Sequence, residues 1–129
     1  MATREDIEAF LIRASMPYEE VEECMWVVQD SGSSEQIVVR MAGPLVLFRV
    51  KVLELDKVER RPQLFEKLLE LNAGEMVHGA YGIANDAIVL TCALRSENLD
   101  YNEFQGTIDD FSLAMTNHYE TLASFQPAA

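Results

Sequence analysis

The sequence predicts a single α+β domain over residues 1–129, with helices packed on an antiparallel sheet. Apolar residues recur at helical spacing in three stretches, and they alternate at strand spacing in the stretches between them. One long strand has a charged face and an apolar face, which is typical of an antiparallel sheet with one side in water. The expected order is a helix, a three-strand antiparallel meander, a second helix, a β-hairpin and a long C-terminal helix.

The first helix is expected at Thr3–Ala14. Thr3 and Asp6 have the spacing of a capping box, in which two residues of the first turn satisfy each other's backbone N–H groups. Apolar residues follow at helical spacing. Pro17 disfavours the helical conformation in the residue before it, so the helix has to end first.

Three strands are expected next, at Glu22–Asp30, Gln36–Ala42 and Leu45–Leu55. The turn cluster 31–34 separates the first two strands, and Gly43-Pro44 separates the second from the third. Together these strands form the meander.

Basic residues gather in the middle of the chain, although the net charge is −12. Most of them lie between residues 40 and 67: Arg40, Arg49, Lys51, Lys57, Arg60, Arg61 and Lys67. Arg49 and Lys51 share the charged face of the third strand. One interpretation is a solvated sheet face followed by the start of a helix. The other is a docking surface for an acidic partner or for the acidic ends of a second copy.

The second helix is expected to begin near Pro62 and to end at Asn72-Ala73-Gly74, with Gly74 in a left-handed cap. Phe65 and Leu69 extend its apolar stripe into a wide arc. A single sheet does not need so much apolar surface, so these two side chains predict a second contact, for example with another subunit.

Residues 77–94 are expected to form the hairpin, with Asn85-Asp86 as its two-residue loop. One set of side chains then points to the core: Val77, Tyr81, Ile83, Ile88, Leu90, Cys92 and Leu94. The other set is small and weakly polar: His78, Ala80, Gly82, Val89, Thr91 and Ala93. We expect Gly79 to make room for a helix, and Gly82 to keep the outer face flat enough for a helix or an extended peptide.

The last helix is expected to run from Asp100, which caps it together with Glu103, to about Phe125. Its apolar stripe includes His118, which we interpret as a packed residue. Residues 126–129 are expected to form a frayed tail.

Charge and spacing also argue against several functions. So acidic a chain repels phosphates and anionic lipids, and we expect neither nucleic acid nor a membrane as a partner. No apolar run could span a membrane and no signal peptide is visible, so we expect a cytoplasmic protein in which Cys24 and Cys92 are free thiols.

No catalytic motif is evident either. His78 and Asp86 lie about 20 Å apart along the hairpin, so Asp86 cannot orient that histidine. No ligand spacing or phosphate loop is present, and we expect no metal and no cofactor. An enzyme stays an alternative only if residues that are distant in the sequence form an active site in the folded protein.

Three stretches resemble a known family: LFEKLLELNA (residues 64–73), HGAYGIANDAIVLTCAL (residues 78–94) and ENLDYNEFQGTIDDFSLAM (residues 97–115). These stretches are similar to the YbjN-type family. In that family a helix ending near Leu-Asn is followed by a glycine-bearing strand, a tight hairpin and an acid-capped helix. That family shares the type III secretion (Tir/CesT-type) chaperone fold, and the order of elements along nearly the whole chain resembles this fold too. Residues 1–40 match no secretion-chaperone pattern.

The resemblance implies a small acidic homodimer that binds a segment of another protein, as secretion chaperones hold an unfolded stretch of an effector. We therefore expect a non-enzymatic, chaperone-like module for an effector-like polypeptide. The residues expected to contact the partner through apolar surfaces are Phe65, Leu69, Ala80, Gly82 and Val89. The alternative is a regulatory or signalling subunit, since YbjN-type proteins are described as sensory transduction regulators. It would dock a folded partner on the Arg49 and Lys51 face.

Overall fold

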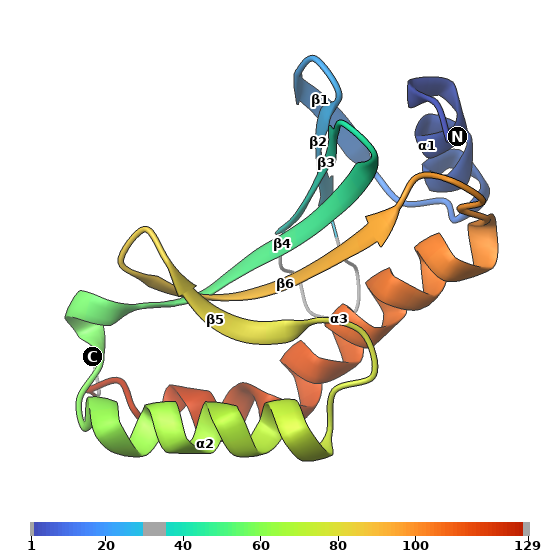
Figure 1. Cartoon of the computed structure of the whole chain (residues 1–129). Coiled ribbons are helices and arrows are strands. Elements are labelled where there is room, and N and C mark those ends of the chain that lie inside the picture. Colours follow the sequence, from blue (N-terminus) through green and yellow to red (C-terminus); the bar gives the residue numbers. More distant parts are fainter. Residues whose placement is uncertain (1, 30–35, 128–129) are drawn as a thin grey trace.

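The structure, a computed structural model, describes residues 2–29 and 36–127. It confirms the predicted α+β class, because in these residues an antiparallel sheet of six strands lies against three helices (Figure 1). The helices are α1 (Arg4–Arg13), α2 (Arg61–Gly74) and α3 (Tyr101–Ala123), and the 3-10 turn η1 (Leu55–Lys57) precedes α2. The strands are β1 (Tyr18–Glu22), β2 (Met25–Gln29), β3 (Gln36–Ala42), β4 (Leu45–Glu54), β5 (Ala80–Ala84) and β6 (Ala87–Arg95).

The strands lie in the order β1-β2-β3-β4-β6-β5, and each neighbouring pair is antiparallel. The first four strands form a meander, and α2 then carries the chain to the far edge, where β5 begins (Figure 1). The predicted hairpin is confirmed: Asn85 and Asp86 have φ of +52° and +60°, and Ala84 pairs with Ala87. β6 thereby pairs with β4 and joins the two halves of the sheet.

The helices bury one face of this sheet. Trp26 on β2, Phe48 on β4 and Leu90 on β6 point into the core and are at most 1% exposed. The ring of Phe48 lies 5.4 Å from that of Phe104 and 6.4 Å from that of Phe111, both on α3. The long helix therefore packs directly across the central strand.

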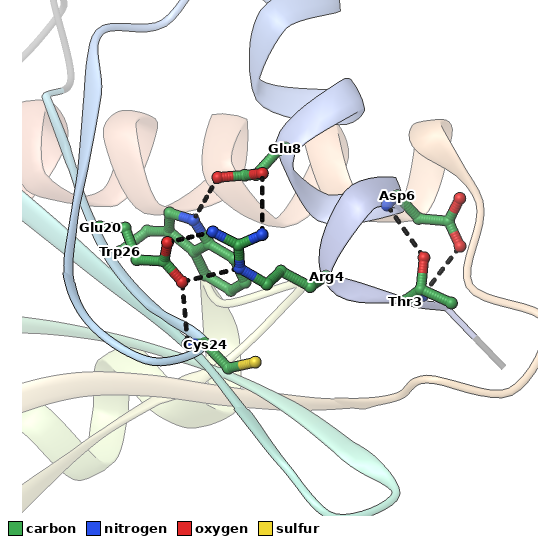
Figure 2. A network of polar contacts seen from close by, with 7 residues as sticks. All are labelled: Thr3, Arg4, Asp6, Glu8, Glu20, Cys24 and Trp26. Carbon is green, nitrogen blue, oxygen red and sulfur yellow. Dashed lines mark hydrogen bonds and ion pairs between the residues drawn. The ribbon is translucent and has the colours of Figure 1, made fainter.

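The predicted capping box begins α1. Thr3 Oγ1 accepts a hydrogen bond from the Asp6 backbone N–H at 3.2 Å, and the Asp6 carboxylate accepts one from the Thr3 N–H at 2.8 Å (Figure 2). The helix ends at Arg13, with Ala14 as its C-cap, before Pro17. The predicted range Thr3–Ala14 thus corresponds to the helix with its two caps.

A network of polar groups around Trp26 holds α1 against the sheet (Figure 2). Arg4 donates two hydrogen bonds to the Glu20 carboxylate on β1, one of them 2.9 Å long, and Glu20 also accepts the backbone N–H of Cys24. The Trp26 indole donates to Glu8 on α1 at 3.2 Å. The hydrogen bonds from Arg4 and then from the Cys24 N–H favour the ionised form of the Glu20 carboxylate and lower the pKa of Glu20 to about 2.

The strand β1 was missed by the sequence prediction, which placed one strand at Glu22–Asp30. The chain instead turns at Glu23 and Cys24, where Cys24 has φ of +59°, so Glu22 ends β1 and β2 begins at Met25. β1 lies at the sheet edge and is rich in glutamate, so it lacks the apolar alternation that identifies a strand. Charged side chains are typical of edge strands, which have to avoid pairing with other chains.

Three further expectations were wrong. Gly74 is the last residue of α2 and has no left-handed conformation, and Glu75 forms the C-cap with φ of −128°. Val77 and Ile83 are 80% and 58% exposed and lie outside the core, because Val77 precedes the strand and Ile83 lies at the loop end of the hairpin. The predicted turn 31–34 and the last two residues of the predicted tail, 128–129, lie outside the described residues.

Gly79 is confirmed as a close-packing position. It has φ of +85°, and an added Cβ would lie 2.6 Å from the carbonyl oxygen of Thr91 and 2.9 Å from the Phe111 ring on α3. The hairpin can approach α3 only because this residue has no side chain.

We predict that Gly79→Ala destabilises the protein by about 3 kcal/mol, from the left-handed backbone and the backbone clash together. Gly82→Ala is the matched control, because a Cβ there meets open space. It should change the free energy of unfolding by less than about 1 kcal/mol. Urea denaturation measures both, and equal effects would contradict the packing argument.

We also predict that Glu20→Gln lowers the melting temperature at pH 7, and that its difference from the wild type disappears on acidification. The pKa of Glu20 is lower in the folded protein than its ordinary value of 4.5, so the stabilisation is complete above that value and is lost as the pH falls towards about 2. Thermal melts between these pH values measure the change. Glu19→Gln, at an exposed position of the same strand, should show a much smaller effect, and a gap that stays constant with pH would contradict the role of Arg4.

Candidate functional site

The side of the sheet opposite the three helices carries no helix of the described residues, and we call it the open face (Figure 1). Strand register decides which side chains it presents, because successive residues of a strand point to opposite faces. The paired residues of β2, β3, β4, β6 and β5 place these side chains there: Met25, Val27, Val38, Arg40, Leu45, Leu47, Arg49, Lys51, Ala80, Gly82, Val89, Thr91, Ala93 and Arg95.

A hollow of about 470 Å³ lies in the middle of the open face. Its lining is largely apolar, and its residues come from four adjacent strands: Met25, Val38, Arg40, Leu47, Phe48, Arg49, Thr91, Cys92 and Ala93. Leu47 lies near its centre, because it is opposite Arg40 on one side and Ala93 on the other. A concave apolar surface of this size is typical of a binding site.

The open face is basic, although the protein as a whole is acidic. Arg40 and Arg49 line the hollow, and Arg95 lies opposite Leu45 at the end of β4. Within residues 2–29 and 36–127, none of these three arginines forms an ion pair.

Lys51 differs from these arginines, because its Nζ lies 2.6 Å from the Glu54 carboxylate. Lys57 also approaches Glu54, at 3.1 Å, and the hydrogen bonds from the two lysines lower the pKa of Glu54 to about 2. Glu54 therefore offsets part of the positive charge at the lysine end of the open face, whereas the arginines keep theirs for a partner.

The structure brings together five of the residues predicted to contact a partner: Arg49, Lys51, Ala80, Gly82 and Val89 all lie on the open face. Arg49, Lys51, Ala80 and Gly82 are exposed there. Val89 is only 5% exposed, contrary to its expected role as an accessible contact. It is opposite Lys51 and Gly82, and the long lysine side chain stands beside it.

Phe65 and Leu69 do not belong to the open face, since they lie on α2. They precede Asn72 on one side of the helix, and the Asn72 amide contacts the backbone of Tyr81 on the edge strand β5. The amide accepts the Tyr81 N–H at 2.8 Å and donates to the Tyr81 carbonyl at 3.1 Å. Leu69 is 69% exposed, Ile83 on β5 is exposed as well, and Phe65 is half-buried against the core; we call these three side chains of α2 and β5 the edge patch.

His78 has a carboxylate partner that the sequence did not reveal. Asp86 is not that partner, as expected, but Asp110 on α3 contacts the Nδ1 of His78. A histidine oriented by a carboxylate is part of many hydrolytic sites, yet none of the residues in 2–29 and 36–127 provides an activated nucleophile beside it. The thiol of Cys92 lies in this region, and burial raises its pKa, so the thiol stays protonated and weakly nucleophilic.

His118 is packed in the core, as the sequence predicted. It is 5% exposed, its Nδ1 lies 2.7 Å from the Tyr81 hydroxyl, and its Nε2 lies 3.7 Å from a Glu75 carboxylate oxygen. Burial, with a smaller contribution from Glu75, raises the pKa of Tyr81 to about 12. The tyrosine hydroxyl is therefore a structural hydrogen-bonding group at neutral pH.

The described residues contain no group of three or more histidine, cysteine, aspartate or glutamate side chains that could hold a metal ion. They also include no helix long and apolar enough to cross a membrane. The centre of the hollow was not predicted from the sequence; Val38, Leu47 and Ala93 form it from separate strands. The alternation of side chains can be recognised along each strand of the sequence. Which residues of neighbouring strands lie side by side depends on the strand register, and spacing along the chain does not determine it.

The fold is that of several solved structures. The chain aligns with YbjN from E. coli at a TM-score of 0.67 and 13% identity, covering 92% of each chain. It aligns with a chain of the heterodimeric ExoU-SpcU complex of the Pseudomonas aeruginosa type III secretion system at 0.70 and 14% identity, covering 90% of this chain and 97% of that one. A chain of the ExsC-ExsE complex aligns at 0.66 and 14% identity, covering 100% of this chain and 99% of that one.

A search of curated proteins finds no match. The family model CesT_Tir_1, in contrast, matches residues 1–128. This match and the shared fold confirm the resemblance seen in the sequence, and the chain belongs to the CesT_Tir_1 family.

Proposed function

We propose that this protein is a non-enzymatic, chaperone-like module of the cytoplasm that binds a segment of a partner polypeptide on its open face. The hollow around Leu47 is the observation that carries this proposal, because it exposes apolar side chains from four adjacent strands on a side without a helix. Uncovered apolar surface of this extent is costly for a soluble protein, and it commonly marks a site where a partner binds.

The structural neighbours support a partner-binding role. The ExsC-ExsE complex, the heterodimer ExoU-SpcU and the type III secretion chaperone SycH of Yersinia pestis with a fragment of YscM2 are all assemblies of this fold with another protein. The chemistry of the described residues supports a non-enzymatic role, since His78 and Asp110 have no activated nucleophile beside them. We propose that residues 1–129 act as one binding domain.

The edge patch supports a homodimer. Leu69 is 69% exposed although it sits on an apolar stripe, and Ile83 beside the free edge of β5 is 58% exposed. A two-fold axis near α2 and β5 would cover both patches at once, since an isologous interface uses the same surface of each copy. The partner-binding open face would stay accessible in such a dimer.

A regulatory subunit that docks a folded partner is the second candidate. The exposed arginines of the open face favour it, because complementary charges determine the orientation and association rate of two docking surfaces. The first function requires an unfolded segment of the partner and the second a folded partner. Binding of an unfolded polypeptide therefore distinguishes the two functions.

We predict that the protein binds reduced, carboxymethylated α-lactalbumin, an unfolded acidic polypeptide, and that Leu47→Asp weakens this binding about tenfold or more. The substitution puts a charge in the centre of the apolar hollow, and central apolar contacts dominate such interfaces. Fluorescence anisotropy of the labelled polypeptide measures the affinity.

Leu113→Asp is the matched control for this prediction, because Leu113 is exposed on α3, on the helix side of the sheet. It should leave the affinity unchanged. No binding by the wild type, or equal losses in both variants, would contradict binding of an unfolded segment on the open face.

For the dimer, we predict that light scattering gives a mass of about twice 14.6 kDa for the wild type and of one chain for Leu69→Asp. A buried carboxylate at the two-fold interface has no partner and opposes association. Ile12→Asp is the control, because Ile12 is similarly exposed on α1. A monomeric wild type would exclude the dimer and leave the edge patch as a further surface for the partner.

A further inference from the structure

We propose that the segment bound by the open face is acidic as well as apolar, with carboxylates on residues i and i+2 of an extended stretch. This inference rests on the proposed function and adds the chemistry of the partner. Two features of the hollow lead to it: Leu47 and its neighbours provide an apolar floor, and Arg40 and Arg49 provide two cations beside that floor.

The spacing of the two arginines matches an extended chain. Val38 pairs with Arg49 and Arg40 pairs with Leu47, so the two arginines are diagonal neighbours on adjacent strands. Diagonal positions of an antiparallel pair are about 7–8 Å apart. Residues i and i+2 of an extended segment point to the same side and lie about 7 Å apart. One carboxylate can therefore approach each guanidinium.

Arginine is suited to this role. Its planar guanidinium binds a carboxylate through two parallel hydrogen bonds, and it is more weakly hydrated than a lysine ammonium. Two other cations of the chain show the contrast: Arg4 is paired with Glu20, and Lys51 with Glu54. No such carboxylate from residues 2–29 or 36–127 reaches Arg40 or Arg49.

The apolar floor determines what flanks the carboxylates. Leu47 lies opposite Arg40 and two residues before Arg49 on β4, with Ala93 on its other side. The apolar floor therefore adjoins both arginines, within reach of apolar side chains that flank the carboxylates on the same side of the bound segment. The pattern on the bound side is then apolar, acidic, acidic, apolar at every second residue. The charge pairs determine how the bound segment is oriented, and the apolar contacts bury its flanking side chains.

The charge of the remaining surface makes this recognition selective. The net charge is −12, so an acidic segment is repelled from most of the molecule. Acidic residues also mark the far edge of the open face, where Glu19 and Glu22 lie opposite Val27 and Met25. An acidic segment thus has one favourable location, the hollow with its arginines, and like charges oppose the other placements.

The test uses a short fluorescent peptide in which every second residue is, in order, leucine, glutamate, glutamate and leucine, with serine between them. Two control peptides carry glutamine or lysine in place of glutamate. We expect the glutamate peptide to bind about tenfold tighter than the glutamine peptide, and the lysine peptide to bind weakest. Raising the salt concentration should reduce the preference for glutamate.

The variant for this test is Arg40→Gln with Arg49→Gln, which should remove the preference and leave both peptides with equal affinity. Its matched control is Arg13→Gln with Lys67→Gln, which removes the same charge from the helix side, on α1 and α2. The control should keep the preference. If both double variants lose it equally, the effect comes from net charge and the inference is overturned.

The unfolded α-lactalbumin probe separates this inference from the proposed function. If Leu47→Asp abolishes binding of that probe while the glutamate and glutamine peptides bind equally, the open face binds polypeptide without selecting carboxylates, and only the inference fails. If neither the probe nor any peptide binds, both fail. A single-stranded oligonucleotide that displaces the glutamate peptide at equal concentration would also overturn it, because the arginines would then be recognising phosphate.

Discussion

The alternation of side chains along β4 is the constraint on which the rest of the structure depends. β4 is the longest strand and lies in the middle of the sheet, paired with β3 and β6. Phe48 and Val50 point to one side and are packed beneath the helices, whereas Leu47 and Arg49 point to the other. A shift of the register by one residue would exchange the two sets. The core and the open face are therefore two consequences of the same pairing.

Polar groups as well as apolar packing hold the helices to the sheet, and two of these polar networks lie at opposite ends of the sheet. Near the N-terminus, Arg4 and Glu8 on α1 bind Glu20 and Trp26 on the first two strands (Figure 2). Near the C-terminal end of α3, His118 contacts Tyr81 on the opposite edge of the sheet. Each network joins segments that are far apart in the sequence, so the two ends of the twisted sheet are held to the helix layer. Because the helices hold the sheet from its other side, the open face can stay uncovered.

Local signals in the sequence were sufficient for most of the fold. The capping box at Thr3 and the Asn85-Asp86 loop each depend on a few neighbouring residues, and each was predicted. The close packing at Gly79 was predicted from the glycine within a strand pattern, although its contacts, Thr91 and Phe111, are distant in the sequence. β1 was not predicted, because its glutamates suit a solvent-exposed edge and hide the strand pattern. The partner of His78 and the centre of the hollow were also out of reach. They depend on residues brought together by strand register and by the path of α3, which spacing along the chain does not encode.

The side-chain amide of Asn72 has a consequence for assembly. It bonds both the N–H and the carbonyl of Tyr81, and so takes the place that a neighbouring strand would occupy on β5. A foreign strand that docked there would have to displace this amide, and the sheet resists growth from that end. At the other end, the glutamates of β1 repel a second copy of the same strand. Copies of this chain can therefore meet through side chains without fusing their sheets, which favours a closed, soluble particle over an open fibril.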